Sequence, residues 1–148
     1  MAVAHEVLAR YHAAKVPQFR FASMSSRGLA LMIDVLVVML LCRAIAMIAW
    51  DMNQLTALAA ALASIPVYFI AGHGGQSGQT LGKRLLGIAV RNERGRSIGY
   101  DGAAVRWLAS FALALLPPIW LFDGLAAARD ERGRSWHDRV ARSVVIQV

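Results

Sequence analysis

The chain has 148 residues, of which 57% are hydrophobic, and its formal net charge is +7 at pH 7. Soluble domains are about 45–50% apolar on a comparable count, so the composition argues against an ordinary soluble domain. The basic residues flank apolar runs instead of forming a polar face with interleaved aromatic residues. This pattern excludes a nucleic-acid partner and favours a protein embedded in the lipid bilayer.

Residues 1–26 are polar with sparse apolar residues at helical spacing. We expect a cytoplasmic N-terminal segment here, either a short amphipathic helix on the membrane surface or a mobile tail. Pro17 should end such a helix. The residues from Phe19 to Phe21 have the character of interfacial anchors.

Residues 27–148 are expected to form one membrane domain that begins with a hairpin of two transmembrane helices. The first span covers 28–49 and the second covers 55–71. About 20 residues cross a hydrocarbon core of roughly 30 Å. The first run is also longer than the apolar region of a signal peptide, so we expect a retained helix. The second is rich in alanine, which suits close packing, and Pro66 should kink it.

A Gly-rich, basic segment at 72–102 follows, and it is expected to be cytoplasmic. Within it, 88–90 and 97–100 flank a charged turn and predict a small β-hairpin. The basic tail at 129–148 ends in a predicted strand at 143–148, which can pair with the hairpin strands.

The third apolar stretch, 103–128, is interrupted by Pro117 and Pro118, and its topology has two solutions. The turn at 51–54 lacks Lys and Arg, so it should face outward, with the N-terminus inside. One straight third span would then export the basic tail. Two re-entrant half-helices would keep the tail cytoplasmic, but they require cover from an oligomer or a partner. We favour the cytoplasmic tail.

Ionisable residues inside the apolar runs are the candidate functional residues. Asp34 lies seven residues into the first span, where a charged Asp costs about 2.5–3.5 kcal/mol. Arg27 is on nearly the same helix face, about 10 Å away, and is the expected partner. Arg106 is the alternative partner. Asp123 is more readily a helix-end residue, and Arg43 should snorkel to the outer interface. The Arg27 and Asp34 pair is either an ion or proton site or a structural ion pair.

Other chemistry is not indicated. Gly82 and Lys83 lack the spacing of a phosphate-binding loop, and the four histidines are too scattered for a metal site. No nucleophile has an evident base nearby. Cys42 fits a small apolar residue of a helix. We therefore expect no enzyme activity, no metal and no cofactor.

Four sequence blocks in the same order resemble the RDD family of membrane proteins, which is named for one Arg and two Asp. The blocks are Ser26–Asp34, Gly78–Ile88, Arg106–Trp107 and Ser135–Ala141. The resemblance implies that Arg27 and Asp34 are the family's Arg and first Asp. It implies Asp138 as the second Asp, with Asp123 as the competing candidate.

The resemblance also implies a multi-pass protein of the bacterial cytoplasmic (inner) membrane that transports ions or small ligands. In that hypothesis Asp34 exchanges protons with a cation, and Arg27 tunes its pKa. The other hypothesis is an accessory or scaffold subunit of a larger membrane complex. Its partners would be the bilayer, including anionic lipids, and further copies or other membrane-protein subunits. Intramembrane charge favours transport, whereas the small number of spans favours the accessory subunit.

Overall fold

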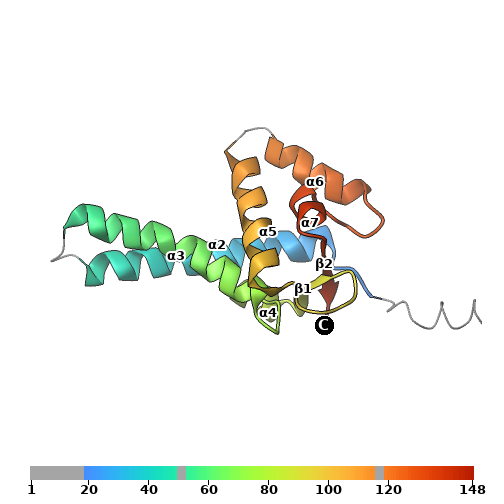
Figure 1. Cartoon of the computed structure of the whole chain (residues 1–148), viewed down its shortest axis with the longest axis horizontal. Helices are drawn as coiled ribbons and strands as arrows, with labels where there is room; N and C mark the ends of the chain where they lie inside the picture. The colour runs from blue at the N-terminus through green and yellow to red at the C-terminus, as the bar shows by residue number, and fades with distance from the viewer. Residues whose placement is uncertain (1–18, 50–52, 116–118) are drawn as a thin grey trace, which may run out of the picture.

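The computed structural model describes residues 19–49, 53–115 and 119–148 (Figure 1). The expected N-terminal amphipathic helix, the first two residues of the polar turn at 51–54 and the two adjacent prolines lie outside these ranges. The elements are, in chain order, α2 (Met24–Ile48), α3 (Gln54–Gly74), α4 (Leu81–Leu85), β1 (Ile88–Asn92), α5 (Gly99–Ala114), α6 (Ile119–Arg129), α7 (Trp136–Val140) and β2 (Ser143–Gln147).

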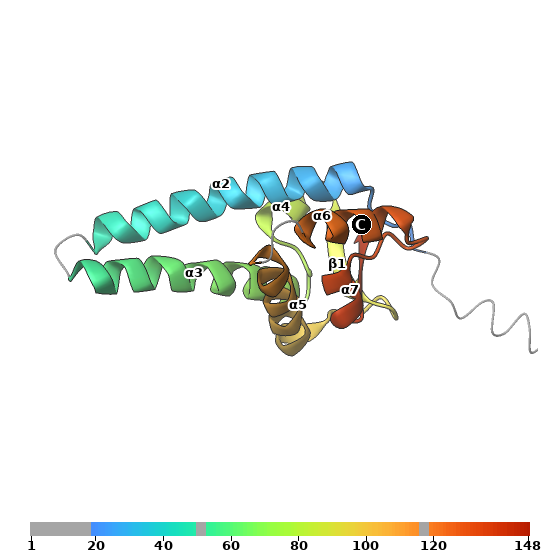
Figure 2. The ribbon, with the colours of Figure 1, turned by 90° about the horizontal axis from the view of Figure 1, so that it is seen from above.

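The two longest helices, α2 and α3, form an antiparallel hairpin that extends away from the rest of the molecule (Figures 1 and 2). Both are long and apolar enough to cross a membrane, and only 11% of the most apolar window of each is buried. The core helix of a soluble protein would be mostly buried, so the hairpin confirms the two predicted apolar helices. Helix α2 begins four residues before the predicted span, because the Ser23 hydroxyl accepts a hydrogen bond from the Ser26 N–H at 3.1 Å and caps it.

The third apolar stretch is two helices, α5 and α6, and not one straight span. Helix α5 packs on α3 and crosses the hairpin direction, so that Figure 2 shows it nearly end-on. A Cβ on Gly74 would lie 2.6 Å from the ring of Tyr100, so glycine allows the start of α5 to approach the end of α3. The arrangement agrees with the alternative of two shorter helices around the prolines, and the straight span is wrong.

The sheet has two antiparallel strands, with Val90 of β1 opposite Val145 of β2. The predicted strand at the end of the tail is therefore confirmed. The tail also returns to the end of the hairpin that carries β1, where α2 begins and α3 ends (Figure 1). Because of this pairing, the tail and β1 share one end of the molecule.

The predicted hairpin between 88–90 and 97–100 is wrong. The backbone does turn after β1, since the Gly95 N–H donates to the Asn92 carbonyl at 2.9 Å. The Ser97 hydroxyl, however, donates to the carbonyls of Gly74 and Gly75 at 3.0 and 2.9 Å. These bonds hold the chain at the end of α3, and Gly99 then begins α5.

The segment before α2 adds a short third edge to the sheet. The Gln147 N–H donates to the Arg20 carbonyl at 2.8 Å, and the Ala22 N–H donates to the Val145 carbonyl at 2.9 Å. Phe21 forms an isolated bridge with Ile146. Of the residues expected to be interfacial anchors, Arg20 is thus hydrogen-bonded to β2 and Phe21 lies opposite it.

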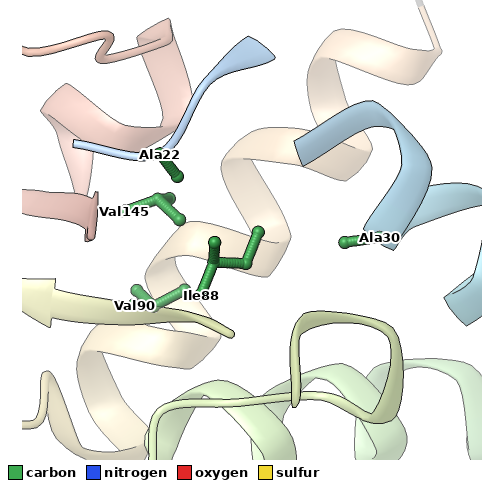
Figure 3. Packing of buried hydrophobic residues seen from close by; sticks show 5 residues of the cluster. All are labelled: Ala22, Ala30, Ile88, Val90 and Val145. Atoms are coloured by element: carbon green, nitrogen blue, oxygen red, sulfur yellow. The ribbon is translucent and has the colours of Figure 1, made fainter. Parts of the chain in front are cut away.

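A small apolar core joins the sheet to the first turns of α2. It consists of Ala22, Ala30, Ile88, Val90 and Val145 (Figure 3). Each is at most 5% exposed. We call the elements gathered here, residues 19–23 together with α4 through β2, the polar head.

Candidate functional site

Asp34 is fully buried on the face of α2 that meets α3 and α4. Its Oδ1 accepts hydrogen bonds from the Tyr68 hydroxyl at 2.7 Å and from the Gly82 N–H at 2.8 Å. Its Oδ2 accepts one from the Thr80 hydroxyl at 2.6 Å. The Tyr68 oxygen in turn accepts from the Leu81 N–H at 3.1 Å. Both oxygens of this carboxylate are therefore satisfied by neutral donors from α3 and the start of α4.

The expected pair between Arg27 and Asp34 is wrong, and so is the alternative pair with Arg106. Helix side chains lean toward the N-terminus of their helix. Arg27 therefore extends away from Asp34, and its guanidinium donates to the Gly133 carbonyl and to Asp138. The prediction considered only that the two residues share a helix face. It did not consider the direction in which the Arg27 side chain leans.

Asp138 of α7 is the fully buried centre of a second cluster. Its two oxygens form ion pairs with Arg106 of α5 and Arg27 of α2. The Ser135 N–H also donates to Oδ2 at 3.1 Å. Burial raises the pKa of Asp138, but Arg106 and then Arg27 outweigh it and hold the pKa well below its ordinary value. Asp138 is consequently an anion shared by two cations, and it connects three helices that are distant in sequence.

A ring of polar residues continues the cluster toward α6. Arg106 donates to the Ser143 hydroxyl at 2.7 Å and lies 3.3 Å from His137 Nε2. His137 Nδ1 lies 2.8 Å from an oxygen of Asp123, whose other oxygen accepts from the Trp136 N–H at 2.7 Å. An imidazole protonated on Nδ1 satisfies both neighbours. Asp123, expected as a helix-end residue, instead fixes the start of α7 and orients His137.

Ser135, His137 and Asp123 together have the composition of a hydrolase triad, but their bonding is that of a helix start. The Ser135 hydroxyl lies 3.0 Å from both ring nitrogens of His137, and it donates to Asp138 at 3.0 Å. The residue is 4% exposed at the position that precedes α7. A nucleophile needs a free path to its substrate, and this hydroxyl is enclosed by its partners.

Two further basic groups are buried between the two carboxylate clusters. Lys83 of α4 is 8% exposed, and its pKa is lowered to about 8 by burial, and by Arg106, against the opposing effect of Asp34. His73 of α3 is 6% exposed, and its Nε2 has no hydrogen-bond partner among the described residues. Among the described residues, the buried region around the two carboxylates therefore holds more basic groups than acidic ones.

The remaining residues singled out from the sequence lie elsewhere. Arg43 is exposed in the second half of α2, and its place at an interface stays a prediction. Cys42 is half-buried, and its Sγ contacts the Ala61 carbonyl at 3.4 Å across the hairpin. Neither residue touches the carboxylates.

Sequence reasoning missed the donors that hold the carboxylates, namely Tyr68, Thr80, Gly82, Ser135 and Ser143. Thr80, Gly82 and Ser135 lie inside the blocks Gly78–Ile88 and Ser135–Ala141 that resemble the RDD family, so those blocks were the available signal. Tyr68 had a weaker one, because a hydroxyl inside an apolar span requires a polar partner.

One of three comparisons with known proteins finds a match. The family model of the RDD family matches residues 21–142, which include Asp34 and Asp138. No curated protein and no solved structure matches the chain. With its two long apolar helices, the chain is a membrane protein, and it belongs to the RDD family.

Proposed function

We propose that this protein is a non-transporting accessory subunit of a larger membrane complex, in which the buried Arg and Asp residues hold the subunit together. One observation carries the proposal: the oxygens of Asp34 and Asp138 are already satisfied by donors of the protein itself. A carboxylate that binds and releases a cation needs oxygens that face a pathway.

The donors come from separate elements, and this supports a structural role. Asp34 connects α2 to α3 and to the start of α4. Asp138 connects α7 to α2 and α5. Both carboxylates therefore bind the hairpin to the polar head.

The surface of the hairpin supports assembly with other membrane helices. Ala59 and Ala63 are exposed on α3 and are four residues apart. Small residues at this spacing allow helices to approach closely in membranes. Two helices cannot by themselves enclose a pathway, and this favours an accessory role over transport by one chain.

The charge distribution supports an orientation in the bacterial inner membrane. The polar head carries the basic residues in and after β1 and before α7, among them Arg91, Arg94, Arg96, Arg132 and Arg134. Cytoplasmic loops carry such an excess of Lys and Arg. We infer that the polar head, and with it the N-terminus and the tail, faces the cytoplasm.

The mass of the protein in native lipid tests the proposal. The full chain, tagged and extracted from its own membranes into lipid nanodiscs, should elute with other membrane-protein chains that mass spectrometry identifies. A particle that holds a single 16.1 kDa chain, or copies of this chain alone, would contradict the accessory role.

Ion transport is the second candidate, and one observation favours it. A groove between α2 and α3 is lined by Tyr68 and Thr80, the two residues whose hydroxyls hold Asp34. Rotation of these hydroxyls would open a route between the groove and the carboxylate. A particle containing only copies of this chain would favour this candidate, which a flux measurement tests directly.

A further inference from the structure

A groove between the hairpin helices has apolar walls and a basic end, and the accessory role does not explain this combination. Its volume is about 410 Å³, which lies within the range of roughly 300–1,000 Å³ typical of small-ligand sites. Leu41 and Ile45 of α2 and Val67 and Ala71 of α3 line its length. These walls belong to the apolar part of the hairpin, so the groove offers an apolar chain a place beside the two helices.

One end of the groove is polar and basic. Ser77, Gln79 and Arg84 line it where the chain leaves α3 and enters α4. Arg84 is exposed, and no carboxylate of the described part of the chain lies within ion-pair distance of its guanidinium. Arg27 and Arg106, by contrast, are both paired with Asp138. Arg84 therefore presents its positive charge at the mouth of an apolar groove.

The groove is apolar along the hairpin and basic at the polar head, so it matches a phospholipid with apolar acyl chains and an anionic headgroup. Leu41 and Ile45 lie in the second half of α2, toward the far end of the hairpin, whereas Arg84 lies in α4 at the polar head. An acyl chain beside Leu41 and Val67 would place its headgroup at the level of Arg84. A basic residue near the membrane surface favours an anionic headgroup over a zwitterionic one.

We propose that this groove binds one anionic phospholipid, with an acyl chain between α2 and α3 and its phosphate on Arg84. The lipid would also cover Tyr68 and Thr80, because both line the groove. The bound acyl chain would then exclude water from the hydroxyls that hold Asp34. The assignment goes beyond the accessory role and stands whether or not the protein has partner chains.

Native mass spectrometry of the delipidated full chain, with phosphatidylglycerol and phosphatidylcholine of identical acyl chains, tests the assignment. Arg84→Gln removes the charge, Val67→Trp fills the groove, and Arg94→Gln removes an exposed charge from another part of the polar head. The wild type should retain phosphatidylglycerol more strongly than phosphatidylcholine.

Arg84→Gln should weaken phosphatidylglycerol binding by about fivefold and leave phosphatidylcholine unchanged, because one basic residue near the surface contributes that much. Val67→Trp should weaken binding of both lipids, and Arg94→Gln should change neither. An equal loss of phosphatidylglycerol binding in Arg84→Gln and Arg94→Gln would overturn the proposed site. It would show that any positive charge on the polar head attracts the lipid. Unchanged lipid binding by Val67→Trp would overturn the place assigned to the acyl chain.

Discussion

Replacement of Asp138 with asparagine is expected to lower the free energy of unfolding by about 3–5 kcal/mol, the cost of breaking a buried ion pair by removing one partner. The substitution leaves the buried Arg106 and the partly buried Arg27 around a neutral amide. Each guanidinium then loses the anion that offsets its desolvation. Because the two arginines belong to α2 and α5, the loss should loosen the polar head from the hairpin.

Glu93→Gln is the matched control, since it also turns a carboxylate that pairs with two arginines into an amide. Glu93 is half exposed and pairs with Arg132 and Arg134 at 3.6 and 3.2 Å. Exposed ion pairs contribute about 0–1 kcal/mol. Chemical unfolding of both variants in detergent micelles measures the difference. Equal stability of the two variants would show that the buried cluster does not hold the fold.

Gly82→Ala is expected to cost about 3 kcal/mol or more, at the upper end of the range for overpacked interiors. A Cβ at this position would lie 2.2 Å from the Ala30 carbonyl oxygen and 2.9 Å from Oδ1 of Asp34. The oxygen of Ala30 belongs to the backbone of α2 and cannot rotate away. Helix α4 would have to move, which would break the bond from the Gly82 N–H to Asp34.

Gly28→Ala provides the control, in helix α2, against which Gly82 packs. A Cβ on Gly28 would meet nothing within 4 Å, and alanine is favoured over glycine in a helix by about 1 kcal/mol. This variant should therefore unfold at an equal or higher denaturant concentration than the wild type. A Gly82→Ala variant as stable as Gly28→Ala would contradict the close packing of α4 on α2.

The hairpin could be predicted from the sequence because local composition determines it. Two apolar runs of about 20 residues, separated by a polar turn, have few alternatives in a membrane. The strand at 143–148 was predictable for a similar reason, since its apolar β-branched residues differ from the basic tail before it. These signals lie within single segments.

The contacts between segments could not be predicted in the same way. Strand β1 pairs with a segment about 50 residues later, and Ser97, which was expected in a strand, is bound to the end of α3. The partner of Arg27 depends on the fold of α7, more than 100 residues away. Asp34, Arg27 and Arg106 were found from their charge beside or within apolar runs, and Asp138 was found from the family resemblance. Their pairing could not be predicted, because it depends on the packing of the polar head.

Proton and sodium flux in proteoliposomes tests most directly whether Asp34 is a structural joint. The wild type and Asp34→Asn should both show the same leak as protein-free liposomes under an imposed pH or Na⁺ gradient. Asp34→Asn should meanwhile unfold more easily than the wild type, because an amide accepts the three donors less well than a carboxylate. Wild-type flux above the leak that disappears in a folded Asp34→Asn variant would contradict this account.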